Sequence, residues 1–496
     1  MLNRQTFKTA ILLYMFINRL AKYIILSIFV CALVLLYSCS VPRPVSRNTL
    51  PVPAAYESFE DSARTEKVSW QSLFEDPVLK NLIDTAIQNN LDLQNTLEYI
   101  AISRANLLFN RGLGLPSLDG FVSASADKFG KYTMTGVGNF DTNLSQNINE
   151  DQKVGVNPTQ EYFLGLKSSW EIDIWGKLRS RKKAAAARLL ATEQGRQWAI
   201  TQLVTQVATL YFELLAMDSK LEIIRRNIEL QEHSLEVVKV MKEGGRATSL
   251  AVQQFTAQLL QTRSLEQETI LNIIRLENEL NTMLGRFPTS IARGASINAQ
   301  PIPAVIATGI PADLLRKRPD ILEAELQLEA SKANVDAARK AFFPSLTLTP
   351  YLAFNAFKLP LMFANGSLAY GILGDITQPI FNRYQLRADF SVANAEQNIA
   401  FNTYQKYVLN GYQEVFTNLK AIEQYKKVVA LNDEEVRTLA EAVQTSNDLF
   451  LGGYAGYLEV VTAQKGVLDA ELNKTMSQRL LLQSIVDIYR SLGGGW

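Results

Sequence analysis

The sequence contains one long segment twice, and this internal duplication constrains the fold more than any other feature. Residues 90–118 align without a gap to residues 318–346, so that Pro116 matches Pro344, which lies 228 residues later. A duplication on this scale predicts two structurally similar halves and a quasi-symmetric assembly. We therefore expect a first structural repeat in 70–310 and a second in 311–496.

Each repeat is expected to hold very long helices. No proline occurs in 159–287 or in 380–496, and proline in the interior of a helix breaks it. A helix from Lys177 to Lys242 would rise about 100 Å at 1.5 Å per residue, which is longer than a globular domain is wide. Apolar residues in this stretch recur in alternating steps of four and three, the pattern of a coiled-coil seam. The seam, in which only Gln231 is polar, comprises Leu203, Val207, Leu210, Leu214, Met217, Leu221, Ile224, Ile228, Gln231, Leu235 and Val238.

A pair of glycines ends each long helix in this prediction. Gly244 and Gly245 precede Arg246 in the first repeat. The corresponding residues in the second repeat are Gly452, Gly453 and Tyr454. Glycine ends helices by taking the left-handed conformation, and another apolar-periodic segment follows each pair. Each repeat is thus predicted to form a long antiparallel helical hairpin with its tip at 244–248 or at 452–457.

Four short segments between the helices alternate between apolar and polar residues. In "EYFLGLKSSWEIDIW" every second residue on one face of an extended chain is apolar except Ser168, which predicts a strand. These residues are Tyr162, Leu164, Leu166, Trp170, Ile172 and Ile174. The predicted strands are 117–126, 161–175, 345–355 and 367–381. A soluble sheet with one face exposed to water and a strand of a transmembrane β-barrel share this pattern. The pattern therefore does not decide between a soluble sheet and a membrane barrel.

Four strands are too few to close a barrel. An open sheet edge in lipid leaves backbone groups without hydrogen bonds, and transmembrane barrels begin at about eight strands. If these strands span a membrane, several chains must share one barrel, with eight strands in a dimer or twelve in a trimer. The predicted fold class is thus an α+β membrane protein with long antiparallel coiled-coil helices, and the counting does not fix the number of chains.

The N-terminus has the features of an export signal. An apolar run at 23–36 follows Arg19 and Lys22, and it is short for a membrane-spanning helix. It ends in "LYSCS", which resembles a bacterial lipoprotein signal with Cys39 as the acylated residue. We expect a signal peptide at 1–38 and a lipid-anchored tether at 39–69. An ordinary signal peptide with an incidental cysteine is the alternative, and Met15 is a second candidate start.

Composition argues against several classes of function. The chain has 50 Lys and Arg against 49 Asp and Glu, whereas nucleic-acid binding usually leaves a basic footprint. One histidine and two cysteines disfavour a His/Cys metal cluster and a Ser-His-Asp triad. No phosphate loop or nucleophile motif is present. We therefore expect no enzyme activity, no cofactor, no bound metal and no nucleic-acid partner.

Five motifs in order resemble the TolC-like outer-membrane efflux protein family, in particular its NodT-type lipoprotein branch. They are "WEIDIWGKLRSRKKAA" (170–185), "LLRKRPDILEAE" (314–325), "AFFPSLTLT" (341–349), "ITQPIF" (376–381) and "YRSLGGGW" (489–496). The resemblance implies a homotrimer with a twelve-stranded barrel in the outer membrane of a Gram-negative bacterium and a helical barrel in the periplasm. It also implies a membrane-fusion adaptor and an inner-membrane pump of the RND type as partners in exporting drugs, dyes, detergents or metal ions.

The same resemblance implies roles for residues near the helix turns. Adaptor-contacting residues would be Gly244, Gly245, Arg246, Gly452, Gly453 and Tyr454. Residues at the periplasmic aperture would be Glu459, Thr462 and Lys465. Many family members have aspartate at the position of Thr462, so an acidic ring and its cation selectivity do not carry over. Glu459 and Lys465 are either a gating pair or two solvated surface charges.

Two other functions remain open from the sequence. A duct for type I protein secretion would use the same architecture, and the lipoprotein signal favours the efflux branch over it. A lipid-anchored periplasmic coiled-coil scaffold would need no pore, and the alternating segments argue against it. The sequence does not identify the exported compound, the partner pump or the resting state of the aperture.

Overall fold

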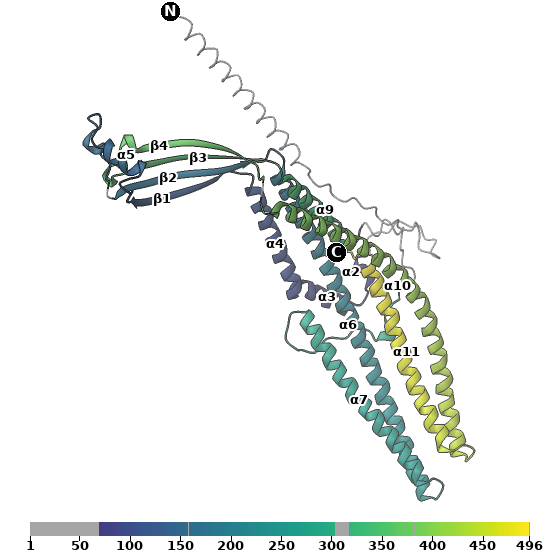
Figure 1. The fold of residues 1–496 in the computed structure, drawn as a ribbon. Coiled ribbons are helices and arrows are strands. Elements are labelled where there is room, and N and C mark those ends of the chain that lie inside the picture. Colours follow the sequence, from purple (N-terminus) through teal and green to yellow (C-terminus); the bar gives the residue numbers. More distant parts are fainter. Residues whose placement is uncertain (1–68, 157, 303–316, 381, 496) are drawn as a thin grey trace, which may run out of the picture. The chain divides into compact units, whose positions relative to one another are not determined.

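The computed structural model describes residues 69–156, 158–302, 317–380 and 382–495 (Figure 1). The predicted signal peptide, nearly all of the predicted tether, Cys39 and the boundary between the two predicted repeats lie outside these residues. The helices are α2 (Trp70–Leu73), α3 (Pro77–Asn89), α4 (Leu91–Gly112), α5 (Met134–Thr142), α6 (Lys177–Glu243), α7 (Ser249–Met283), α9 (Pro319–Lys340), α10 (Gln385–Leu451) and α11 (Tyr457–Ser491). The strands are β1 (Ser117–Asp127), β2 (Thr159–Ile172), β3 (Ser345–Ala356) and β4 (Leu368–Thr377).

The duplication is visible in the lengths of the helices. α4 and α9 each have 22 residues, α6 and α10 each have 67, and α7 and α11 each have 35. The offset between the copies falls from 228 residues at Pro116 and Pro344 to 208 residues at Gly244 and Gly452. The second copy is thus 20 residues shorter between these positions. The difference lies in the strand hairpin, because the loop 357–367 between β3 and β4 is shorter than the loop 128–158 between β1 and β2.

The described residues fall into two compact units that cut across both copies. The sheet unit comprises 105–186 and 329–399, and the helical unit comprises the described residues of 69–104, 187–328 and 400–495. Each unit takes a part of each copy. The two sequence repeats are therefore not two separate compact bodies.

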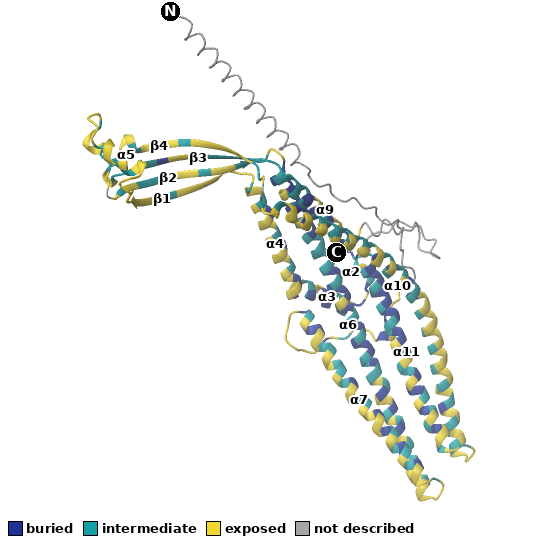
Figure 2. Ribbon diagram, in the orientation of Figure 1, coloured by how far each residue is buried: buried dark blue, intermediate teal, exposed yellow. Residues whose placement is uncertain are grey.

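The core of the helical unit lies mainly along α6 and α11, where Figure 2 shows most of the buried residues. Every residue of the predicted α6 seam is buried or half-buried, and Tyr211, Leu214 and Ile488 are almost completely enclosed. One described helix, α6, has a stretch long and apolar enough to cross a membrane, but 67% of that stretch is buried within the chain. Such burial is typical of a core helix.

The sheet has four strands in the order β1-β2-β3-β4, and each adjacent pair is antiparallel (Figure 1). The pairing of β2 with β3 joins the strand hairpin of one copy to that of the other. The four predicted strands are present.

Two strands end earlier than the sequence predicts. β2 stops at Ile172 and not at 175, because the Asp173 carboxylate accepts hydrogen bonds from the backbone N–H groups of Leu178 (3.0 Å) and Arg179 (2.8 Å) at the start of α6. β4 stops at Thr377 and not at 381, two residues before Pro379, which has no N–H to donate to a ladder. The alternating pattern of apolar residues continues past both ends, and it therefore misplaced them.

Candidate functional site

The two turns that join the long helices have the same backbone geometry. In the first, the N–H of Arg246 donates to the carbonyl of Met241 (2.7 Å), and Gly245 has a φ of +70°. In the second, the N–H of Tyr454 donates to the carbonyl of Leu449 (2.8 Å), and Gly453 has a φ of +76°. Both are helix ends closed by a left-handed glycine, so two equivalent turns face solvent with similar backbone shape.

The side chains of the two turns differ. Thr248 caps α7, because its hydroxyl accepts from the backbone N–H of Ala251 (3.2 Å). Gly456 occupies the equivalent position before α11 and offers no side-chain cap. Tyr454 is 87% exposed, and Arg246 is also exposed but carries a charge. A partner that recognised both turns would therefore meet similar backbones and different side chains.

The helix ends next to the turns share a small apolar core. It is built of Leu235, Val238, Ala251, Phe255, Leu259 and Val460, with Phe450 and Tyr457 packed against it. Phe255 and Val460 are each 1% exposed. Residues of α6 and α7 thus pack directly against α11, and the two turns are held together within one chain.

The predicted aperture residues are exposed along one side of α11. Glu459, Thr462 and Lys465 are all exposed, whereas Val460 and Gln464 between them are buried. Among the described residues, neither Glu459 nor Lys465 has an ion-pair partner. Six residues apart on a helix, they are separated by about 9 Å along the axis and about 120° around it. One chain does not bring them together, so any pairing between them would have to join two chains.

The sheet has one apolar face and one polar face. The strand register places the following residues on the first face: Leu118, Val122, Leu164, Leu166, Trp170, Leu348, Leu352, Phe354, Leu368, Tyr370, Ile372 and Ile376. Many of these are exposed, with Tyr370 at 77% and Ile376 at 75%. The polar exceptions on this face are Ser168 and Gln160.

All six charged residues of the strands lie on the opposite face. They are Asp119, Asp127, Glu161, Lys167, Glu171 and Asp375. An apolar face in lipid and a polar face toward water is the arrangement of a transmembrane barrel strand. The outer edges of β1 and β4 have no strand beside them among the described residues. This sheet can therefore line a water-filled pore only if other chains complete it.

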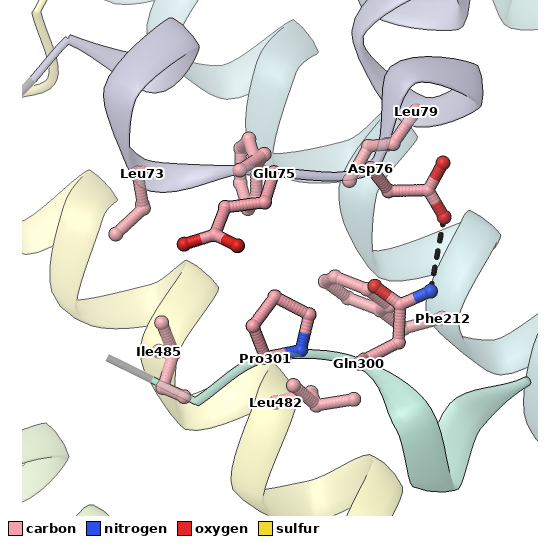
Figure 3. A pocket seen from close by; sticks show the side chains of 10 residues that line it. Leu73, Glu75, Asp76, Leu79, Phe212, Gln300, Pro301, Leu482 and Ile485 are labelled. Carbon is pink, nitrogen blue, oxygen red and sulfur yellow. Dashed lines mark hydrogen bonds between the residues drawn. The ribbon is translucent and has the colours of Figure 1, made fainter. Parts of the chain in front are cut away.

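A small cavity in the helical unit does not serve as a binding site (Figure 3). It holds about 20 Å³, which is room for roughly one water molecule. Of its two carboxylates, Glu75 is exposed to solvent. Asp76 is buried and already accepts hydrogen bonds from the N–H of Val78 (2.8 Å), the hydroxyl of Tyr211 (2.8 Å) and the amide of Gln300 (2.9 Å). Burial, and then the hydrogen bond to Asp76, raise the pKa of Tyr211. This network is a satisfied part of the core.

Two of the sequence motifs meet in a buried ion-pair cluster. Arg318, 1% exposed, donates to both carboxylate oxygens of Asp320 (3.0 and 2.7 Å) and to Glu414 (2.9 Å). It also donates to the carbonyl of Ser491 (3.0 Å). The start of α9 is thereby fixed to the end of α11. The motif at 314–325 and the motif at 489–496 therefore carry a structural contact that the sequence alone did not indicate.

No group of three or more His, Cys, Asp or Glu side chains is placed to hold a metal ion in the part of the chain that the structure describes. The exposed side chains at the turns and along the sheet are suited to recognising a partner and to lining a passage.

Comparisons with known proteins agree with this geometry. A family model described as "Outer membrane efflux protein" matches residues 82–286 and 310–494. The toluene efflux pump outer membrane protein TtgF of Pseudomonas putida is 30% identical over 478 residues, covering 93% of this chain and 95% of its own. The probable outer membrane lipoprotein SilC of Salmonella typhimurium is 26% identical, covering 92% and 93%. A crystal structure of CusC, 25% identical, superposes with a TM-score of 0.77 and covers 92% of this chain and all of that one.

Proposed function

The chain belongs to the outer membrane efflux protein family, and from that premise we propose that three copies form one passive duct. The sheet units of the three copies would close a twelve-stranded barrel in the outer membrane. The helical units would line a tunnel in the periplasm. An adaptor and an inner-membrane pump, for which an RND pump is our proposal, would supply cargo and energy. The duct itself would perform no chemistry and need no cofactor.

The two-faced sheet is the observation that carries this proposal. Its exposed apolar face suits lipid, its charged face suits water, and neither outer edge is paired by another strand of the described residues. Free edges cannot remain in the hydrocarbon core, because each unpaired backbone group there costs several kcal/mol. Strands from other copies are the simplest way to satisfy them. Twelve strands would enclose a water-filled lumen.

The cargo is proposed at the level of a class. TtgF is named for toluene, so one relative serves an apolar aromatic compound. We propose small molecules as the cargo of this chain, with drugs, dyes, detergents and metal ions as candidates. The polar face of the sheet would line a wide passage, which is compatible with the transit of all of these compounds.

The two turns are the proposed contact with the adaptor. Gly244, Gly245 and Arg246 in one turn correspond to Gly452, Gly453 and Tyr454 in the other, and all are accessible to solvent. Because the two turns have equivalent backbone shapes, adaptor subunits of one kind could dock at both of them. Next to them, Glu459, Thr462 and Lys465 would line the aperture, with Glu459 of one copy pairing with Lys465 of a neighbouring copy in the closed state.

Single-channel conductance of the purified protein in planar bilayers tests the duct and its aperture together. Wild type is compared with Glu459→Ala and Lys465→Ala, and with Glu435→Ala as a control on an exposed part of α10. Small, rare openings that grow in either aperture variant and not in the control are expected. Channels unaffected by both aperture variants would remove the gating pair and leave the duct. Correctly inserted protein with no conductance, together with equally silent tip-truncated variants, would contradict the duct and favour a scaffold.

The lipid anchor is a separate proposal. Cys39 follows the apolar run of the N-terminus, and SilC is named as an outer membrane lipoprotein. Intact-mass measurement of the exported protein should show an acylated N-terminus at Cys39. Cys39→Ser should lose the added acyl mass, whereas Ser38→Ala, which keeps the cysteine, should retain it. An N-terminus cleaved elsewhere without acyl groups would contradict the anchor.

A further inference from the structure

The polar face of the sheet contains one patch of aromatic rings. Phe121 of β1, Phe163 of β2 and Tyr351 of β3 all lie on the face that carries the charged residues. The ring centroids of Phe121 and Phe163 are 4.9 Å apart, and those of Phe163 and Tyr351 are 6.3 Å apart. Both pairs meet edge to face, the favoured arrangement of aromatic pairs. We call these three residues the aromatic patch.

Small residues beside the rings make the patch possible. Phe121 lies opposite Gly165 in the strand register, and Tyr351 lies opposite Gly371. A Cβ at Gly371 would come within 2.7 Å of the Tyr351 ring, and a Cβ at Gly165 would come within 2.2 Å of that of Ala353. A side chain at Gly371 would displace the Tyr351 ring, and one at Gly165 would push β2 away from Ala353 of β3. The patch is therefore a built feature of three strands and not one isolated aromatic residue.

The charges next to the patch have opposite signs. Asp119 and Lys167 are directly opposite in the register of β1 and β2, and the Lys167 amine lies 5.8 Å from the centroid of the Phe121 ring. The other four charges of this face belong to other rows of the ladder, at Asp127, Glu161, Glu171 and Asp375. Asp119 and Lys167 therefore offset each other beside Phe121, and the rings themselves are the distinguishing chemistry of the patch.

The rings remain accessible on this face. Tyr351 is 39% exposed, and Phe121 and Phe163 are half-buried, whereas Ala353 next to them is 2% exposed. An interior that only needed to be polar would place no such rings there, because lumen-facing positions of transmembrane strands are generally polar. The exposed rings offer a surface on which a flat apolar group can stack.

We infer that the aromatic patch binds small molecules that carry an aromatic ring as they pass through the lumen. The inference rests on the proposed trimeric duct, in which three such patches would surround one passage. Each contact would be weak, because an aromatic pair adds only a severalfold preference over an apolar contact of equal area. Weak and repeated binding suits a conduit, since a bound molecule must also leave.

Matched probes in planar bilayers test this inference. Benzoate is compared with cyclohexanecarboxylate, and benzylammonium with cyclohexylmethylammonium, so that each pair shares its charge and approximate size. The aromatic member of each pair is expected to reduce the mean current at roughly threefold to tenfold lower concentration than the saturated member. Equal block by both members would overturn the inference. A preference within only one charge sign would also overturn it, because Asp119 or Lys167 would then be the recognising group.

Substitutions locate the effect. Phe121→Leu, Phe163→Leu and Tyr351→Leu should each reduce the preference for the aromatic probe, and Tyr351→Phe should retain it. Tyr370→Leu makes the same change on the opposite, apolar face and should have no effect. Only variants that form trimers of wild-type mass are compared. Unchanged preference in all three patch variants would overturn the inference. Failure of wild type to conduct at all would instead contradict the duct, and the inference would fall with it.

Discussion

At the scale of single residues, the turn glycines have different tasks although they are adjacent. Gly245 has a φ of +70°, a conformation that costs a residue with a Cβ about 1–2 kcal/mol. Gly244 has no positive φ, and a Cβ there would meet its nearest atoms at 3.7 Å. The requirement for glycine is therefore conformational at one position and absent at its neighbour.

Gly245→Ala should loosen the first turn, and Gly244→Ala should not. We expect the backbone amide of Arg246, which closes the turn on Met241, to exchange with solvent about tenfold faster in Gly245→Ala. Hydrogen exchange followed by mass spectrometry of tip peptides measures this. Equal exchange in the two variants would mean that the turn does not need its left-handed residue.

Tyr489 should make the protein less stable at high pH. Burial raises its pKa to about 12, from an ordinary value of about 10. Between these values the unfolded chain loses the proton and the folded chain keeps it, so the free energy of unfolding falls as pH rises, by at most about 1.4 kcal/mol per pH unit. Below pH 10 the residue contributes no pH dependence. Thermal unfolding in detergent between pH 9 and 12, at roughly half-unit steps, measures the slope.

Tyr489→Phe should reduce that slope, and Tyr454→Phe, at an exposed tyrosine, should leave it unchanged. The pKa of Tyr211 is also raised, first by burial, so part of the slope should persist in Tyr489→Phe. A slope that is identical in wild type and Tyr489→Phe would contradict the assignment.

At the scale of elements, the one polar residue of the α6 seam is a weak point of the core. Gln231 is 1% exposed, and neither atom of its amide has a hydrogen-bond partner among the described residues. A buried polar group without a partner costs about 1–3 kcal/mol. Gln231→Leu should therefore raise the free energy of unfolding by roughly that amount, as measured by denaturant unfolding in detergent.

Gln464 provides the matched control for Gln231. It is equally buried, but its amide nitrogen donates to the hydroxyl of Ser234 (2.8 Å), so that only its Oε1 has no partner among the described residues. Gln464→Leu removes a formed hydrogen bond and should stabilise less than Gln231→Leu or should destabilise by about 1 kcal/mol. If both substitutions had the same effect, the missing partner at Gln231 would not be the cause.

The elements also show what the sequence could and could not predict. The α6 seam was predictable because its apolar steps persist over many turns, and the helix ends were predictable because Gly245 and Gly453 follow them. The end of β2 was not, because a single carboxylate, Asp173, starts α6 before the alternating pattern stops. α5 was also missed, since the loop around it is held by side-chain bonds such as that from Asn143 to Val154.

Some of the candidate sites could likewise be predicted from the sequence, and others could not. The turns followed from glycine chemistry, whereas the roles of Glu459, Thr462 and Lys465 came from resemblance and remain proposals. The aromatic patch could not be predicted, because Phe121, Phe163 and Tyr351 become neighbours only through the register of three strands. Register depends on pairing between segments far apart in the chain, which a single sequence does not display.

At the scale of the whole molecule, the number of chains is the central prediction. Native mass spectrometry of the detergent-solubilised protein should give three chains, each close to the 55.5 kDa of the full sequence less any removed signal peptide. Three chains supply twelve strands, enough for a water-filled lumen, whereas two supply eight, a barrel whose interior side chains fill. A stable dimer or monomer that still conducts would contradict the shared barrel.

The free edges of β1 and β4 have a genetic consequence. Because no chain can complete its own wall, a subunit with a damaged edge strand harms every assembly that it joins. If damaged and intact subunits are made in equal amounts and mix freely, only about one trimer in eight is wholly intact. Mutations at these edges should therefore be dominant, whereas mutations that prevent the chain from joining a trimer should be recessive.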